Sequence, residues 1–306
     1  MQRSCLALLI LPFAFGTSAA NSQTTSPEQR PAAVLATSEG AVKYGSNPAA
    51  GHTFKHGGVQ LYYEIYGSGE PLLLVHGNGG SIADFKAQID DFRRHYQVIA
   101  MDSRDQGRSA DSSGVLTYEV MTDDLAALID HLKCGPVNVL GWSDGGIEAL
   151  LLGIRHPEDV KKIAAMAANL YPNGLYPTIL AWIKSNLNSM SPADRETPQG
   201  KRETKLLELM LREPQIDARA LESIKAPTLV LAGDHDAIVD EHTLEIYHHI
   251  PNSQLSIFPN ATHMIPYDDP VLFDSTIERF LQAPFVAKDR LNDLLKSYEA
   301  MLAAQK

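Results

Sequence analysis

A serine placed between glycines is the clearest chemical feature of this sequence. Residues 141–146 read Gly-Trp-Ser-Asp-Gly-Gly, which places Ser143 in a Gly-x-Ser-x-Gly pattern. An apolar run at 137–140 precedes the pattern and a segment of helical pattern at 143–155 follows it, as a nucleophile elbow requires. The glycines permit a tight turn that exposes the hydroxyl at a helix N-terminus, where developing negative charge is stabilised. The pattern therefore predicts that Ser143 is a nucleophile.

A serine nucleophile needs a general base, and the base needs an acid that orients it. In a parallel sheet the acid and then the histidine follow later strands. Asp234 and Asp236 both follow one buried apolar run, and His263 follows the next. His263 is therefore the expected base. His235 is a rival base, but it shares its loop with the two aspartates.

A glycine-rich loop, His-Gly-Asn-Gly-Gly at 76–80, follows another short apolar run. The backbone N–H of Asn78, paired with that of Asp144, is expected to form an oxyanion hole. The Asp144 carboxylate has two open interpretations. It could face the pocket and favour cationic substrates, or it could interact with the N-terminus of its own helix.

Alternating apolar strands and helices must position these groups. This rhythm predicts an α/β fold: a mostly parallel, eight-stranded sheet with helices on both faces and a small helical cap. The strands are expected at 52–55, 59–66, 71–75, 98–101, 137–140, 160–167, 227–232 and 254–258. The core helices are expected at 82–96, 118–132, 143–155, 241–250 and 271–281, and the cap helices near 177–187 and 202–212.

The chain divides into five expected parts. Residues 1–20 have the basic start, apolar run and small residues of a secretory signal peptide cut near Ala20, which predicts export to the periplasm or the medium. A flexible leader is expected over 21–52. The core is expected over 53–167 and 223–283, the cap over 168–222, and a C-terminal helix packed on the sheet over 284–306.

Composition narrows the class of protein further. The 306 residues carry a formal net charge of -11 without a basic cluster, so nucleic acid is not an expected partner. After cleavage Cys134 remains as a single, buried cysteine, which excludes an internal disulfide. No spacing indicates a metal site, a nucleotide cofactor or a stable membrane anchor. No motif specifies an oligomeric state.

With these residues in place, the sequence over about 53–283 resembles the α/β-hydrolase superfamily. The elbow and the modest cap are similar to the valacyclovir hydrolase and biphenyl-hydrolase-like branch and to small carboxylesterases. His76-Gly77 resembles the family's oxyanion loop, and 102–109 resembles its Asp-x-Arg-x-x-Gly-x-Ser loop. The spacing Gly233-x-x-Asp236 resembles its acid loop, which favours Asp236 over Asp234 as the acid.

The resemblance implies a serine hydrolase that cleaves a carboxylic ester through Ser143, His263 and Asp236, and the layout of residues 1–20 predicts that it is exported. Its partner would be a small-molecule ester or lactone, without a cofactor. Lactone hydrolysis, including that of large rings, and C–C bond hydrolysis use the same triad and stay open. A ligand-binding receptor with a silent triad is an alternative of another class. The candidate substrate-binding residues are Trp142, Asp144, Tyr171, Tyr176 and Trp182.

Overall fold

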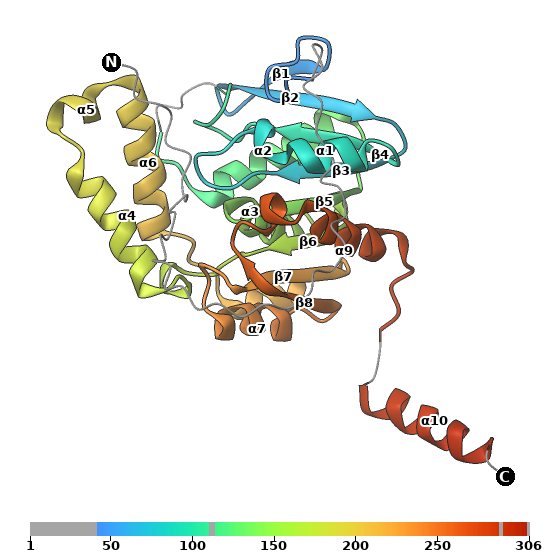
Figure 1. Cartoon of the computed structure of the whole chain (residues 1–306). Helices are drawn as coiled ribbons and strands as arrows, with labels where there is room; N and C mark the ends of the chain where they lie inside the picture. The colour runs from blue at the N-terminus through green and yellow to red at the C-terminus, as the bar shows by residue number, and fades with distance from the viewer. Residues whose placement is uncertain (1–41, 110–113, 288–289, 305–306) are drawn as a thin grey trace, which may run out of the picture.

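An eight-stranded sheet forms the centre of the protein (Figure 1). The structure is a computed structural model that describes residues 42–109, 114–287 and 290–304. The strands are β1 Gly51–His56, β2 Val59–Gly67, β3 Glu70–Val75, β4 Tyr96–Met101, β5 Val137–Trp142, β6 Val160–Met166, β7 Thr228–His235 and β8 Ser253–Thr262. Their order across the sheet is β1-β2-β4-β3-β5-β6-β7-β8. β2 pairs antiparallel with β1 and β4, and the neighbours from β4 to β8 pair in parallel, as the sequence predicts.

Helices cover both faces of this sheet. The helices of the described residues are α1 Lys86–Phe92, α2 Tyr118–Leu132, α3 Asp144–Arg155, α4 Pro177–Ser189, α5 Pro192–Glu196, α6 Pro198–Arg212, α7 Asp240–His249, α8 Ile265–Asp268, α9 Pro270–Gln282 and α10 Arg290–Ala303. Short 3-10 turns are η1 Ile82–Phe85, η2 Pro157–Asp159, η3 Pro172–Gly174 and η4 Ala218–Ser223. Within the described residues no helix combines the length and apolar character needed to cross a membrane.

The side chains of β3 explain why its sequence is continuously apolar. Leu73 and Val75 pack into a core with α2, α3 and α7, whereas Leu72 and Leu74 pack into a second core with α1 and α9. Successive side chains of a strand point to opposite faces, so a strand covered on both faces has no polar positions. The two cores hold the carboxyl ends of the central strands in place, and the candidate site lies there.

The segment expected to be one helix over 82–96 is divided. η1 is followed directly by α1, which ends at Phe92, and turns at 93–95 lead into β4. β4 begins at Tyr96 because this residue pairs with Glu70 at the start of β3. The turns take 93–95 and the sheet takes Tyr96, so four residues of the expected helix are not helical.

The predicted leader ends earlier than the sequence indicates, because residues 44–50 pack on β2. The buried Glu64 carboxylate accepts the backbone N–H of Gly45 and of Asn47, both at 2.8 Å. The hydroxyls of Tyr62 and Tyr66 donate to the same carboxylate at 2.7 Å each. Four donors satisfy this buried carboxylate, and two of them hold Gly45 and Asn47 against β2.

The cap and the C-terminal helix lie outside the sheet. The cap is built from α4, α5 and α6, one helix more than predicted, and it stands at one side of the molecule (Figure 1). The expectation that the C-terminal helix packs on the sheet is wrong. α10 projects away from the body, and the described side chains from 292 to 304 are all exposed (Figure 1).

Candidate active site

Ser143 lies on a strained turn between β5 and α3. Its φ of 59° and ψ of -119° are unusual for a residue with a side chain. A Cβ on Gly141 would lie 1.9 Å from the carbonyl oxygen of Gly145, and a Cβ on Gly145 would lie 1.9 Å from that of Val75. Both positions therefore require glycine, and the close approach of strand and helix is what presents the Ser143 hydroxyl.

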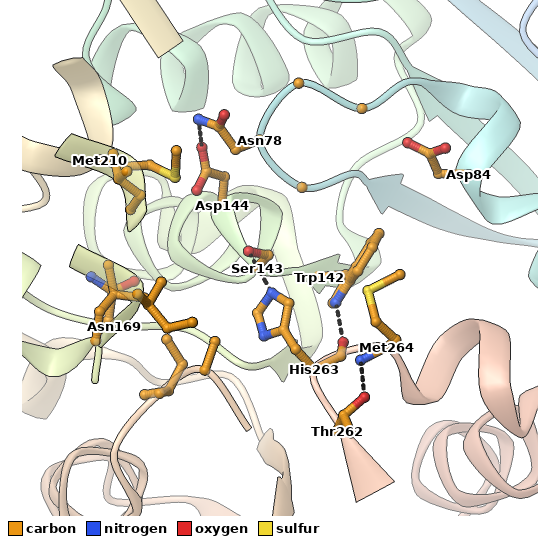
Figure 2. A pocket seen from close by; sticks show the side chains of 18 of the residues that line it. Asn78, Asp84, Trp142, Ser143, Asp144, Asn169, Met210, Thr262, His263 and Met264 are labelled. Atoms are coloured by element: carbon orange, nitrogen blue, oxygen red, sulfur yellow. Dashed lines mark hydrogen bonds between the residues drawn. The ribbon is translucent and has the colours of Figure 1, made fainter. Parts of the chain in front are cut away.

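His263 and Asp236 complete a chain of hydrogen bonds from Ser143. The Nε2 atom of His263 lies 2.9 Å from Ser143 Oγ (Figure 2). Its Nδ1 atom lies 2.7 Å from Asp236 Oδ1. Asp236 and His263 follow the neighbouring strands β7 and β8, so the sheet brings their side chains together. The structure thus brings together the three residues predicted from the sequence.

The environment of Asp236 keeps it ionised. Burial raises its pKa, but the charge of His263, the hydrogen bond to His263 and backbone donors together outweigh burial and lower the pKa below its ordinary value. The backbone N–H groups of Gly233, Ala237 and Ile238 all donate to this carboxylate. Asp236 is therefore fixed in one orientation, with one oxygen toward the imidazole.

Asp234 and His235, the rivals for the acid and the base, form hydrogen bonds away from Ser143. Asp234 accepts the backbone N–H of Asn260 at 2.9 Å and of Ala261 at 3.0 Å. These bonds and the one to His235 lower the pKa of Asp234 to about 2. Asp234 therefore anchors the segment that leads to His263, and His235 lies beside it on the surface.

The glycine-rich loop after β3 lies directly against the elbow. A Cβ on Gly77 would come 3.1 Å from that of Ser143. His76 holds the loop as a structural residue, since its Nδ1 bonds to Gly77 O at 2.8 Å and its Nε2 accepts from Ser103 N at 3.0 Å. As the first residue of α3, Asp144 has a backbone N–H without an intrahelical acceptor. Asn78 and Asp144 line the same cavity as Ser143, and the assignment of their N–H groups to an oxyanion hole stays a prediction.

Trp142 has a role that the sequence did not indicate. Its indole Nε1 donates to the carbonyl oxygen of His263 at 2.9 Å (Figure 2). Its ring centroid lies 5.8 Å from that of His263 and 5.4 Å from that of Tyr267. Trp142 therefore supports the base as well as lining the cavity.

A cavity of about 630 Å³ opens in front of Ser143, between the sheet and the cap. Trp142, Asp144 and Trp182 line it, as predicted. Tyr171 and Tyr176 are outside its lining: the Tyr171 hydroxyl donates to Glu245 at 2.6 Å, and Tyr176 is exposed at the start of α4. Lining residues that sequence reasoning missed include Asp84, Asn169, Met210, Glu213, Met264 and Tyr267. They come from separate loops and helices, and no local motif marks them.

Carboxylates dominate the charge of this cavity. Asp84, Asp144, Glu213 and Asp268 line it, and none of the described lining residues is a lysine or an arginine. Asp144 is 4% exposed and accepts hydrogen bonds from the side chains of Asn78 and Tyr118. Burial raises the pKa of Asp144, and these two bonds oppose that effect.

One group of side chains away from the cavity has the spacing of metal ligands. His156, Glu158 and Asp159 bring their ligand atoms within 4.8 Å of one another among the described residues. His156 Nε2 already bonds to Asp123 at 2.9 Å, and Asp123 also pairs with Arg155. The group therefore belongs to a surface ion-pair network.

Comparison with known proteins agrees with this fold. Residues 70–191 match the family model of the alpha/beta hydrolase fold. Serine hydrolase BPHL from Homo sapiens is 28% identical over 279 residues, which cover 84% of this chain and 91% of that protein. The fold and the arrangement at the elbow define a hydrolase of the α/β class. The chain therefore has the α/β-hydrolase fold and is similar in sequence to hydrolases.

Solved structures share the same architecture. The enol-lactonase from Burkholderia xenovorans LB400 superposes with a TM-score of 0.64 at 21% identity, covering 76% of this chain and 100% of that one. A thermophilic esterase from Thermogutta terrifontis has a TM-score of 0.59 at 27% identity, covering 75% and 96%. The sheet and the connections around the elbow are therefore those of a known hydrolase scaffold.

Proposed function

We propose that this protein hydrolyses a carboxylic ester through an acyl-enzyme on Ser143. The observation that carries the proposal is the continuous chain Ser143 Oγ, His263 Nε2, His263 Nδ1 and Asp236 Oδ1, with separations of 2.9 and 2.7 Å. Likeness to a relative named a serine hydrolase supports it.

The geometry suits a two-step reaction. His263 Nε2 takes the Ser143 proton as Oγ attacks the ester carbonyl carbon, and the backbone N–H groups of Asn78 and Asp144 stabilise the oxyanion. The alcohol leaves with the proton from His263. Water then attacks the acyl-enzyme with the same histidine as base, which frees the acid and regenerates Ser143. Asp236 stabilises the imidazolium in both steps.

Replacing Ser143 by alanine tests this assignment. Turnover of a nitrophenyl ester should fall by at least about 1000-fold, because the nucleophile is lost while the cavity remains. The circular dichroism spectrum and the thermal midpoint should stay close to those of the wild type. A fluorophosphonate probe should label the wild type at Ser143 and leave the variant unlabelled. Absence of labelling in the wild type would favour a receptor over an enzyme.

The charge of the cavity supports a substrate class. Four carboxylates line it without a lysine or arginine among the described lining residues, so the acyl or alcohol part is proposed to be neutral or cationic. Matched nitrophenyl esters with aminoacyl, neutral and succinyl groups test this. The succinyl ester should have a kcat/KM at least about 10-fold below that of the aminoacyl ester. The panel should include lactones and a C–C ring-cleavage substrate, since preference for either would replace the ester proposal.

We also propose that the protein is exported. The support is the layout of residues 1–20, which lie outside the described residues. Expression in a bacterial host followed by fractionation and intact-mass measurement tests this. The mature chain should begin at Asn21 and appear outside the cytoplasm. A cytoplasmic protein that keeps Met1 would refute it.

A further inference from the structure

The two residues placed in the oxyanion hole are joined by their own side chains. Asn78 Nδ2 donates to Asp144 Oδ2 at 2.9 Å, although the residues are 66 positions apart (Figure 2). Asn78 lies in the loop after β3, and Asp144 begins α3. The bond therefore spans the opening between the two segments whose backbone N–H groups are to bind the oxyanion.

The acceptor in this bond is held firmly. The carboxylate of Asp144 is nearly fully buried, and Tyr118, itself buried, donates a second hydrogen bond to it. A buried carboxylate is stable only where such donors surround it, so its orientation is fixed. Asn78 consequently has a rigid partner on the α3 side of the hole.

The same amide group also contacts the cap. Asn78 Nδ2 lies 3.3 Å from the carbonyl oxygen of Leu206 in α6. The neighbouring residue Lys205 pairs with Asp105 Oδ2 at 3.1 Å, and Gln106 Oε1 accepts the backbone N–H of Gly79 at 2.6 Å. Helix α6 thus meets the oxyanion loop both directly and through the loop at 102–109.

We propose that the side chain of Asn78 is a positioning group that sets the separation of the two oxyanion donors, with Asp144 as its partner. The inference rests on the proposed ester hydrolysis and adds a part that acts through the donors. Oxyanion stabilisation requires donors at hydrogen-bond distance from the developing charge, and a shift of about 1 Å can reduce the rate about 100-fold. Loss of the bond should therefore lower kcat, whereas loss of a contact with the substrate would raise KM.

Three single variants separate this role from a charge effect. Asn78→Ala and Asp144→Ala both remove the bond and keep the backbone N–H groups. Asp144→Asn removes the charge but keeps an acceptor oxygen for Asn78 and a polar partner for Tyr118. Asn252→Ala is the matched control, because Asn252 Nδ2 donates to a backbone carbonyl, that of Lys225, on the surface.

The assay uses the full chain and a neutral nitrophenyl ester, with rates divided by the sites that a fluorophosphonate titrates. Asn78→Ala and Asp144→Ala should each reduce kcat by about 10- to 100-fold, with KM within about threefold of the wild type. The double variant should lose no more kcat than the single variant with the larger loss, since both substitutions remove the same bond. Asn252→Ala should keep kcat within about threefold, and Asp144→Asn should lose at least about threefold less kcat than Asp144→Ala, because it keeps an acceptor for Asn78. An arylboronic acid, which forms a tetrahedral adduct, should bind the two alanine variants more weakly by a similar factor.

Other results overturn the proposal. An Asp144→Asn loss as large as that of Asp144→Ala would assign the effect to charge. Losses that multiply in the double variant, or an unchanged kcat per titrated site, would show that the bond does not position the donors. Failure of the proposed function has a separate signature, because the wild type itself would then neither hydrolyse esters nor react at Ser143, and the positioning role would fall with it.

Discussion

At the scale of single residues, Asp234 and Asp236 illustrate how two similar side chains acquire different tasks. Asp234 lies near the end of β7 and Asp236 follows that strand directly. Only Asp236 is buried and directed at His263, while Asp234 binds the backbone ahead of that histidine. The difference arises from two residues of chain length at the end of one strand. It determines which carboxylate can stabilise an imidazolium.

Exchange of each aspartate for asparagine should reveal this division. Asp236→Asn should reduce kcat by about 10⁴-fold, because an amide there no longer holds the imidazole in the correct tautomer. Asp234→Asn should reduce it by roughly 10-fold or less, since the amide oxygen still accepts a backbone bond. Steady-state kinetics on one ester measures both. Equal losses would contradict the assignment of the acid.

Glu148 is a buried acid one helical turn beyond Asp144. Neither of its carboxyl oxygens has a hydrogen-bond partner among the described residues. Burial, followed by the charges of Asp144 and Asp124, raises its pKa well above the ordinary value of 4.5. Glu148 therefore keeps its proton to a higher pH in the folded protein than in the unfolded chain.

The raised pKa of Glu148 makes the free energy of unfolding depend on pH. Above pH 4.5 the unfolded chain releases the Glu148 proton while the folded protein retains it, so the free energy of unfolding falls as pH rises. Glu148→Gln removes the effect. Urea titrations at pH 5 and pH 8 should show that wild-type stability declines more steeply than that of the variant, by up to about 1.4 kcal/mol per pH unit. Parallel slopes would mean that Glu148 ionises normally.

At the scale of elements, the elbow depends on the contact between β5, α3 and β3. Gly145→Ala places a methyl group against the carbonyl oxygen of Val75, at 1.9 Å without rearrangement. We expect a loss of at least about 3 kcal/mol in unfolding free energy, or no folded protein. Gly114→Ala is the control, since nothing lies within 4 Å of the added carbon. Denaturant unfolding of both variants measures this loss. A Gly145→Ala protein as stable as the wild type would contradict the expectation.

The elements also explain which predictions succeeded. The elbow, the acid and the base each follow a strand, so period and chain order were sufficient to place their segments. The choice of Asp236 over Asp234 came from the resemblance of its spacing to the family's acid loop. The lining of the cavity was harder, because Asp84, Met210 and Tyr267 meet there only after η1, α6 and α8 have packed. Aromatic content alone indicated Tyr171, yet its hydroxyl is directed to Glu245 in α7.

At the scale of the whole molecule, α10 is separate from the two cores. Leu294, Leu295 and Tyr298 are exposed on it, and the helix projects from the body (Figure 1). The helical pattern of this segment was readable from the sequence, but its position depends on contacts that a pattern does not specify. The body ends in α9, whose last turn is capped by Lys162 Nζ through the carbonyl oxygens of Phe280, Leu281 and Ala283.

Truncation after Phe285 therefore should leave the body intact. Lys162 keeps its three acceptors, and the removed side chains of α10 bury little surface. Calorimetry should give a thermal midpoint within about 2 °C of the full chain, and the ester kcat should be the same. A fall of 5 °C or more would show that α10 stabilises the body.

The contact between Asn78 and the cap uses a main-chain atom of α6, the carbonyl oxygen of Leu206. Because every amino acid supplies that atom, the contact is insensitive to which side chains α6 carries. Residues such as Met210 on the same helix can then be exchanged to reshape the cavity while the backbone contact persists. For enzyme engineering, α6 is thus a place where substrate range can be diversified at low risk to the rate, provided that the helix itself stays formed.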